Sequence, residues 1–427
     1  MRKGDASFVL KGDICYSVSQ SELRTIEGGY LVCEEGVSAG AFESLPQRYE
    51  GLPVVDNDGS MIIPGLTDLH VHAPQFSFRG LGMDLELLDW LNTHTFPEEA
   101  KYADIGYAQC AYHAFVNDVR KGPNTRAVVF ATSHVPATIV LMDMLEASGL
   151  VTMVGKVNID RNSHAELQEA SAEVSTEKTV AWLDAVSGKY RNTLPILTPR
   201  FIPACSDALM RMIAGMQREW GLPVQSHLSE SLDEVEWVRT LCPEASSYAD
   251  AYRRLGVMAS GARCIMAHCV HSYGEEMDIL AETGTFVAHC PQSNTNLSSG
   301  IAPVRKFLDR GLRVGLGSDV AGGSDTSILR VMADAVRVSK LYWRLVDSGD
   351  RPLSVAEAFY LGTLGSGSFF GKVGSFEPGY EFDAVVIDDA SLAAPFPLSI
   401  ADRLARIVYY ADDRNIAVKY ARGRILL

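Results

Sequence analysis

His70 and His72 end an apolar run, Met61–His72, of the kind that forms a β-strand. Alternate residues of a strand face the same side, so the two imidazoles are expected to point to one place. Two converging imidazoles can bind a zinc-type cation. Two polar residues at a strand end would give the same pattern, so the pair alone leaves both interpretations open.

Other apolar runs end in residues of matching chemistry: His227, Glu230, His268 and Asp319. A cation that keeps one position open for water needs three or four nitrogen or oxygen ligands. We therefore predict a metal site formed by His70, His72, His227 and Asp319. Glu230 and His268 remain as groups that can carry protons.

These residues need a scaffold that brings distant strand ends together. Eight apolar runs alternate with stretches of helical composition: Met61–His72, Ala127–Ser133, Val151–Asp160, Leu194–Phe201, Leu222–Ser229, Arg263–Val270, Thr285–Pro291 and Leu312–Asp319. Eight alternations favour an α/β fold with parallel strands closed into a (β/α)8 barrel of the TIM type. Active sites of such barrels lie at the carboxyl ends of the strands, where the predicted ligands fall.

Both ends of the chain have a different pattern. Residues 1–60 and 374–427 contain short alternating segments broken by glycines and acids, typical of antiparallel strands with turns. We expect them to form a second, small β-sandwich domain built from both termini. Residues 61–373 would then be the metal-dependent barrel.

Composition excludes several classes of protein. The 38 Lys plus Arg and 53 Asp plus Glu give a net charge of −15, so a nucleic acid polymer is not an expected partner. We recognise no secretory signal and no apolar run long enough to span a membrane. The eight cysteines form no C-x-x-C pair, which favours reduced, buried thiols such as Cys264, Cys269 and Cys290 in a cytoplasmic protein.

The remaining chemistry-bearing residues receive simpler interpretations. Six histidines are expected to be surface or satisfied core residues, with support of the metal site as an alternative for the last: His94, His113, His134, His164, His271 and His289. Lys156 is expected to be structural or solvated. No lysine ends the fourth run, which carries Arg200 near its end, and this argues against a second, lysine-bridged metal. The glycines of Gly315–Gly323 match no phosphate loop and are expected to let the backbone close around Asp319.

Several motifs together resemble the amidohydrolase superfamily and, within it, the guanine deaminase family. The superfamily resemblance rests on Pro64–His72, His227, His268 and Gly317–Asp319. The closer resemblance, to the guanine deaminase family, rests on further segments: Ala73–Phe76, Leu87–Asn92, Thr95–Ala100, Leu197–Phe201, Ser226–Glu230, Met266–His271, Ala288–Asn294, Leu297–Gly300 and Gly322–Gly323. One departure is the turn Lys121–Arg126, where the family usually has Gly-Thr-Thr.

The resemblance implies hydrolysis of guanine to xanthine and ammonia, with one zinc per chain on the four predicted ligands. It assigns proton transfer to Glu230 and Asp319, and places His268 beside the developing charge. It also implies that Gln75, Arg200 and Phe201 hold the purine. A homodimer is the usual assembly of such proteins.

Elementary chemistry supports the same assignments. Hydrolytic deamination needs hydroxide at neutral pH, which a bound divalent cation provides by lowering the pKa of water to about 7. A carboxyl such as Glu230 can protonate the ring nitrogen beside the attacked carbon. Arg200 offers only donors and suits an exocyclic oxygen, whereas the Gln75 amide can donate and accept. Trp90 and Phe201 can pack on the base, and His227 and Glu230 complete the predicted substrate site.

Two alternatives remain open from the sequence. A related deaminase could act on another aminated purine or a pterin, such as 8-oxoguanine or isoxanthopterin, because the metal site does not distinguish these substrates. A metal-free structural relative would be expected to lack ligands, and here all four are present.

Overall fold

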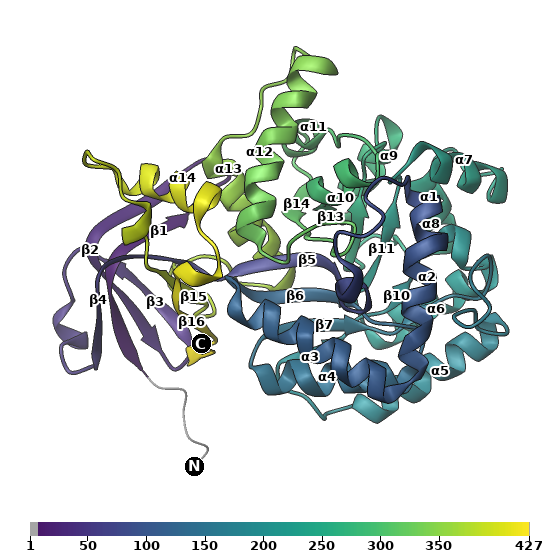
Figure 1. The fold of residues 1–427 in the computed structure, drawn as a ribbon, viewed down its shortest axis with the longest axis horizontal. Coiled ribbons are helices and arrows are strands. Elements are labelled where there is room, and N and C mark those ends of the chain that lie inside the picture. The colour runs from purple at the N-terminus through teal and green to yellow at the C-terminus, as the bar shows by residue number, and fades with distance from the viewer. Residues whose placement is uncertain (1–6, 427) are drawn as a thin grey trace.

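The computed structural model describes residues 7–426 and has two lobes, a barrel and a sheet built from both ends of the chain (Figure 1). Parallel strands form the barrel in two four-stranded sheets, β5-β6-β7-β9 and β11-β12-β13-β14, with β8 and β10 extending β7 and β9. Their bounds are Leu66–His72 (β5), Asn124–Phe130 (β6), Val151–Gly155 (β7), Val157–Asn158 (β8), Thr193–Pro195 (β9), Thr198–Pro199 (β10), Val224–Leu228 (β11), Cys264–His268 (β12), Phe286–His289 (β13) and Arg313–Leu316 (β14). Each of the eight predicted runs contributes a strand to the barrel, so the TIM-type barrel is confirmed.

Hydrogen bonds beyond the strand ends close the barrel. Leu197 bridges to Val224 between the two sheets, and the Asp319 amide donates to the His70 carbonyl at 2.8 Å on the other side. Helices surround the strands: α1 (Leu87–Trp90), α2 (Phe96–Ala100), α3 (Ile105–Lys121), α4 (Val135–Ser148), α5 (Ala172–Val186), α6 (Asp207–Trp220), α7 (Leu232–Leu241), α8 (Tyr248–Leu255), α9 (Glu275–Thr283), α10 (Pro291–Asn296), α11 (Val304–Asp309), α12 (Ile328–Leu345) and α13 (Val355–Tyr360). Ser206 caps α6 by accepting from the Leu209 amide.

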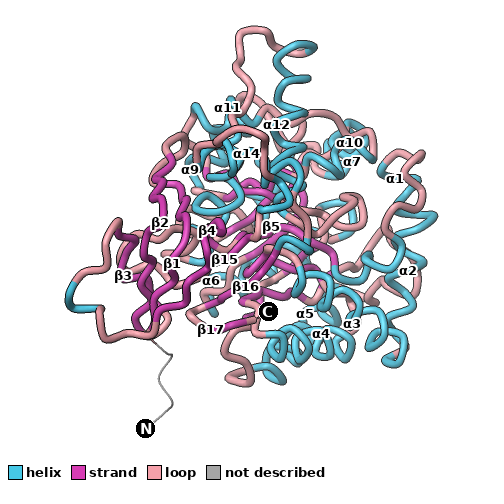
Figure 2. Tube along the Cα trace, turned by 60° about the vertical axis from the view of Figure 1, so that its left-hand side comes forward, coloured by secondary structure: helices cyan, strands magenta, loops and turns pink. Residues whose placement is uncertain are grey.

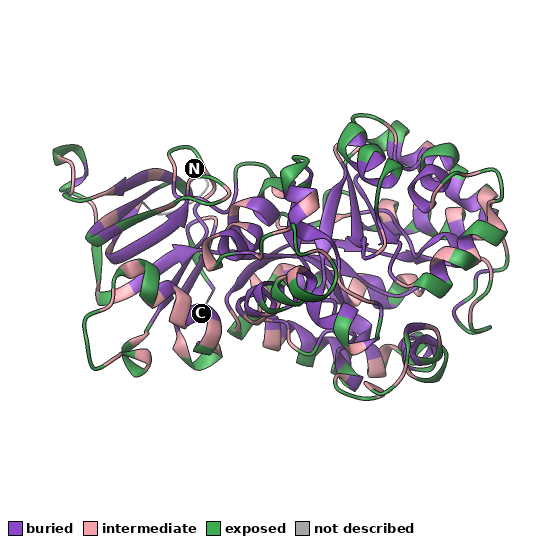
Figure 3. Ribbon diagram, turned by 90° about the horizontal axis from the view of Figure 1, so that it is seen from above, coloured by how far each residue is buried: buried purple, intermediate pink, exposed green. Residues whose placement is uncertain are grey.

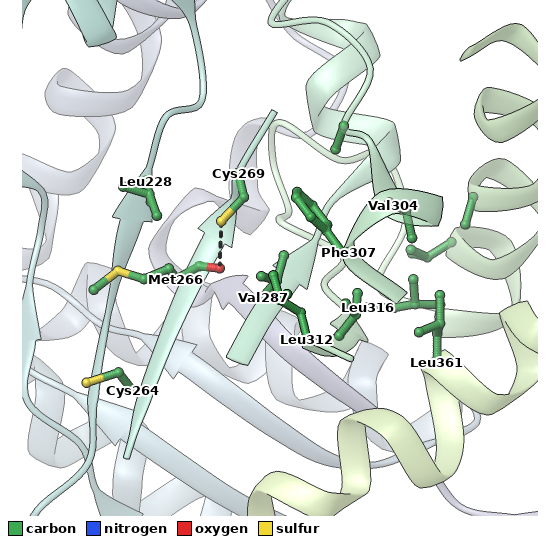
Figure 4. Close-up of a cluster of buried hydrophobic side chains, with 14 of the residues drawn as sticks. Leu228, Cys264, Met266, Cys269, Val287, Val304, Phe307, Leu312, Leu316 and Leu361 are labelled. Carbon is green, nitrogen blue, oxygen red and sulfur yellow. Dashed lines mark hydrogen bonds between the residues drawn. The ribbon is translucent and has the colours of Figure 1, made fainter. Parts of the chain in front are cut away.

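Alternating residues of the barrel strands separate an inner from an outer core. On β12, Ile265 and Ala267 belong to the cluster inside the barrel, whereas Met266 packs between strands and helices. Figure 4 shows part of the outer cluster, in which Met266 lies with Val287 and Phe307. The strands of both lobes are largely buried, and exposed residues gather on outer helices and loops (Figure 3). The buried strands hold the carboxyl-terminal edge of the barrel in a fixed geometry.

The two ends of the chain share one sheet of seven strands in the order β17-β16-β15-β4-β1-β2-β3 (Figure 2). The strands are β1 (Phe8–Ser17), β2 (Leu23–Glu34), β3 (Val37–Phe42), β4 (Val54–Pro64), β15 (Ala384–Ile387), β16 (Ile416–Ala421) and β17 (Arg424–Ile425), and helix α14 (Ile400–Tyr410) lies beside them. The expectation of antiparallel pairing is wrong for β1 and β4, which run parallel. The sandwich form and the division at 60 and 374 stay predictions, and β4 crosses position 60.

The unusual turn Lys121–Arg126 is a contact point between the lobes. Arg126 is fully buried and forms an ion pair at 2.6 Å with Asp383, a residue of the predicted terminal domain that begins at 374. The ammonium group of Lys419 donates to the carbonyls of Val119, Gly122 and Asn124. The turn therefore holds the terminal sheet and contributes nothing to the predicted metal site.

No helix within residues 7–426 combines the length and apolarity needed to cross a bilayer.

Candidate active site

The four predicted metal ligands converge at the carboxyl edge of the barrel. The Nε2 atoms of His70 and His72 lie 3.1 and 3.5 Å from Oδ1 of Asp319. His227 Nε2 lies 3.2 Å from His72 Nε2. All four residues are buried, although β5, β11 and the end of β14 are far apart in sequence. The structure thus brings the predicted set together in one place.

Hydrogen bonds on the far side of two rings determine which nitrogen faces the site. His227 Nδ1 lies 2.6 Å from the carbonyl oxygen of Arg200, which can only accept. In the neutral ring Nδ1 therefore carries the proton, and Nε2 presents a lone pair to His72. His268 Nδ1 likewise contacts Oδ1 of Asn294 at 2.9 Å, which leaves its Nε2 facing the site.

A cation fits these unshared nitrogens. Both ring nitrogens of His70 and Nε2 of His268 are buried without a hydrogen-bond partner among the described residues. Ligand atoms lie within 4.8 Å of one another in the groups His70–His72–Asp319 and His70–His227–His268. Buried lone pairs without donors are costly, and a divalent cation would satisfy them. The second group also places His268 close enough to be a ligand, a role that the sequence did not suggest.

Electrostatics at the site favours neutral imidazoles and an ionised aspartate. Burial lowers the pKa of His72 and His227 well below the ordinary value, and neighbouring imidazoles lower it further. Burial opposes ionisation of Asp319, but His70 and the other imidazoles lower its pKa below the ordinary range. Burial raises the pKa of Glu230 well above its ordinary value, and the charges of Glu234 and Asp319 add to this effect. The two carboxyl groups thus have opposite tendencies to hold a proton.

Local backbone geometry turns the side chains into the site. Ala267 lies in the inner cluster, so regular alternation would direct His268 away from the barrel axis, but its φ of 72° breaks that alternation. Asp319 also has a positive φ, of 48°. Gly317 lets this segment approach β5, because a Cβ there would lie 2.8 Å from the His70 Cβ. The expected close approach of the backbone is thus seen at Gly317.

Asp68 ties the first and last ligand-bearing segments together. Its carboxylate accepts from the amide of His70 at 3.0 Å and from the amide and hydroxyl of Ser318 at 3.0 and 2.5 Å. Phe130, at the end of β6, packs against His70, His72 and His227 with ring centroids 4.5–5.0 Å apart. Neither residue was assigned a role from the sequence.

A pocket opens over the predicted ligands and contains every predicted substrate residue. Its lining combines polar and apolar side chains: His72, Gln75, Leu87, Trp90, Leu91, Arg200, Phe201, His227, Glu230, His268, Leu297 and Asp319. Glu230 Oε2 lies 3.3 Å from His268 Nε2, which is 3.7 Å from Oδ2 of Asp319. An acid, an imidazole and a carboxylate therefore lie next to one another in the pocket.

Sequence reasoning missed one charged residue at this pocket. Glu99 accepts from Arg200 Nη1 at 2.6 Å and from Gln75 Nε2 at 2.9 Å, and is 1% exposed. Its only sequence signal was its place in the segment Thr95–Ala100, since an acid in a short helix is usually solvated.

The other histidines lie outside the predicted ligand set. His289 is buried beneath the site with both ring nitrogens unpartnered among residues 7–426, while His271 contacts the Ser299 carbonyl at 2.9 Å. Lys156 is fully buried and paired with Glu169 at 2.5 Å, so it is structural rather than solvated.

Comparison with known proteins agrees with this geometry. A model of the amidohydrolase family matches residues 61–426. The chain is 33% identical over 443 residues to a guanine deaminase of Dictyostelium discoideum, covering 97% of each chain. It is 36% identical over 375 residues to a guanine deaminase of Homo sapiens, covering 85% of this chain and 82% of the relative. The solved structure of a guanine deaminase from C. acetobutylicum, with guanine bound in its active site, has a TM-score of 0.95 and 41% identity, covering 99% of this chain and 100% of that one.

Proposed function

The chain belongs to the amidohydrolase family, and on this basis we propose that it hydrolyses guanine to xanthine and ammonia. The observation that carries the proposal is one pocket that joins the converging His and Asp side chains to Glu230, Arg200 and Gln75. The reaction adds water across the C=N bond between the ring carbon that bears the amino group and the adjacent ring nitrogen. The bond from that carbon to the amino nitrogen then breaks.

We propose zinc as the cation, one per chain, held by His70, His72, His227 and Asp319. Such a cation, when bound, lowers the pKa of water to about 7 and makes a nucleophile available at neutral pH. The unpartnered ring nitrogens of His70, the close approach of the His72 and His227 Nε2 atoms and the adjacent Asp319 carboxylate support this ligand set.

Asp319 and Glu230 are proposed to carry the protons. Asp319 accepts the proton of the attacking water through its carboxylate. Glu230 delivers a proton to the ring nitrogen beside the attacked carbon, which removes the energetic cost of developing charge there. His268 stands beside the developing charge, within 3.3 Å of Glu230 and 3.7 Å of Asp319. The departing nitrogen takes up the proton held by Asp319 and leaves as ammonia, and the proton of the added hydroxyl group returns to Glu230 as the carbonyl forms.

Arg200, Gln75, Phe201 and Trp90 are proposed to recognise the purine. Arg200 has donors only and pairs with the exocyclic oxygen of guanine, whereas the amino group of adenine would face it donor to donor. An unmatched buried donor costs about 1–3 kcal/mol. Phe201 and Trp90 provide apolar contact, and the Trp90 indole N–H already donates to the Leu81 carbonyl.

A substrate panel tests this function. The purified protein is incubated with guanine, adenine, 8-oxoguanine and isoxanthopterin, and ammonia release is measured together with ultraviolet absorbance. We expect turnover of guanine and none of adenine. Turnover of 8-oxoguanine or isoxanthopterin without guanine would contradict the proposal, as would free acceptance of adenine. A homodimer and a cytoplasmic location stay predictions.

A further inference from the structure

Glu99 lies between the two side chains proposed to recognise the purine, yet does not itself line the pocket. It comes from the short helix α2, and its side chain is buried beneath Arg200 and Gln75. Each carboxylate oxygen has its own partner: Oε2 accepts from Arg200 and Oε1 accepts from Gln75.

We propose that Glu99 is a positioning residue that fixes Arg200 and Gln75 in the orientation that selects a neutral purine with an exocyclic oxygen. This inference rests on the proposed function, because it concerns how the same pocket recognises its substrate. Glu99 acts through two other side chains and needs no contact with the substrate.

The carboxylate determines which way the Gln75 amide faces. A carboxylate can only accept, so Gln75 must direct its NH2 group toward Glu99. The amide oxygen of Gln75 then faces the backbone N–H of Ala321 at 3.3 Å, which can only donate. Both ends of the amide are matched in this orientation and mismatched in the flipped one. Gln75 therefore presents one remaining N–H and one remaining lone pair to a ligand in a fixed arrangement.

The guanidinium group of Arg200 is fixed from two sides by the same helix. Glu99 accepts from Nη1 at 2.6 Å, and the ring of Phe96 lies 5.0 Å from Cζ. Phe96 and Glu99 are three residues apart and so share one face of α2. The bond to Glu99 occupies one edge of the guanidinium group, and the remaining donors are available to an acceptor in the pocket that Arg200 lines.

Glu99 also determines the net charge beside Arg200 and Gln75, the residues proposed to recognise the purine. The negative carboxylate offsets the positive guanidinium at hydrogen-bond distance, so the pair offers directed donors without a net positive charge. An anionic ligand gains little from such a pair. A neutral base with a carbonyl oxygen gains a charge-assisted hydrogen bond, which is the chemistry of the oxopurine edge of guanine.

Binding of two unreactive purines separates positioning from a general structural role. Hypoxanthine carries the exocyclic oxygen and purine lacks it, and neither has an amino group to lose. The dissociation constants of both compounds are measured by calorimetry on the metal-loaded protein. The dissociation constant of purine divided by that of hypoxanthine reports the contribution of the oxygen. For Glu99→Gln we expect this ratio to fall roughly tenfold or more, the scale of one hydrogen bond to a charged group. A glutamine at position 99 can accept from Arg200 only by turning its own NH2 group toward the NH2 group of Gln75. Two donors then face each other.

Glu98→Gln is the matched control. Glu98 precedes Glu99 on α2 and is also buried, but its carboxylate binds Lys101 and Tyr107 instead of a pocket residue. We expect its binding ratio to equal that of the parent. Glu99→Asp, one methylene shorter, should reach only one of the two partners and give an intermediate ratio. It also serves as the test should Glu99→Gln fail to fold.

Two outcomes would overturn the inference. One is an unchanged ratio in folded Glu99→Gln or Glu99→Asp, whether both ligands weaken equally or neither weakens. The other is an equal fall of the ratio in Glu98→Gln. Ammonia release from guanine by the parent is measured separately. A parent that releases none defeats the proposed function, whereas an active parent with an unchanged variant ratio defeats only the role of Glu99.

Discussion

The buried ion pair of Arg200 and Glu99 makes the consequence of one substitution calculable. Arg200→Met keeps most of the apolar length and removes the guanidinium group. Glu99, which is 1% exposed, then loses a cation at 2.6 Å and keeps only the Gln75 amide as a partner. Removing one member of a buried pair costs about 3–5 kcal/mol. We expect the lower end, about 3 kcal/mol, because the adjacent pocket can admit water to the carboxylate.

Urea unfolding of the metal-loaded protein measures this cost. With a slope of about 3 kcal/mol per molar urea, a loss of about 3 kcal/mol lowers the midpoint by roughly 1 M. The double variant Arg200→Met/Glu99→Gln removes the uncompensated charge and should recover more than half of that shift. Neither variant should regain activity on guanine, because both lack the guanidinium donors. Metal content should equal that of the parent, since Arg200 reaches the ligands only through its backbone carbonyl.

Two results would refute this reasoning. One is an Arg200→Met protein that unfolds at the parent's midpoint, which would mean that Glu99 is not left as an uncompensated buried charge. The other is a single variant that hydrolyses guanine at the parent's rate, which would remove Arg200 from recognition.

Three further outcomes are expected. Glu230→Gln should keep its zinc and lose roughly 10² or more in turnover, the scale of a lost general acid; loss of metal would instead make Glu230 a ligand. A chelator should abolish activity and zinc should restore it, with one zinc per chain by elemental analysis and none in His70→Ala; two metals per chain, or activity without metal, would contradict the site. Burial opposes ionisation of Glu357, but hydrogen bonds from Arg351, the helix cap and Arg305 lower its pKa to about 2 from an ordinary 4.5. Because the pKa of Glu357 is lower in the folded state, the stability that its carboxylate contributes to the fold is fully present above about pH 4.5 and is lost as the pH falls toward about 2. The difference in urea midpoint between the parent and Glu357→Gln should therefore shrink over that range, and a constant difference would contradict the assignment.

The barrel and the convergence of the proposed ligands could be predicted because their signals are local. Each buried strand leaves an apolar run in the sequence, and a parallel barrel brings the ends of such runs to one edge. His70, His72, His227 and Asp319 stand at or next to those ends, so no long-range information was needed to place them together. Only the tertiary structure shows that His268 also lies within ligand distance, since its placement depends on one positive φ.

Glu99 could not be predicted in the same way. Its partners lie 24 and 101 residues away, and its helix of five residues is too short to show a periodic pattern. The pairing of β1 with β4 was missed for a related reason. Parallel partners need a crossover, and the intervening β2 and β3 form a meander that looks locally antiparallel.

The residues proposed for catalysis and those proposed for recognition lie in different parts of the chain. The predicted ligands and proton carriers stand on or just after β5, β11, β12 and β14, within a rigid and deeply buried frame. Gln75, Trp90 and Glu99 instead belong to the segment 73–104, which joins β5 to α3 and supplies Gln75 and Trp90 to the pocket lining. Arg200 lies outside this segment, but its guanidinium group contacts Phe96 and Glu99 within it. We therefore expect changes in 73–104 to alter what the pocket recognises while the strand ends keep the predicted ligands in place.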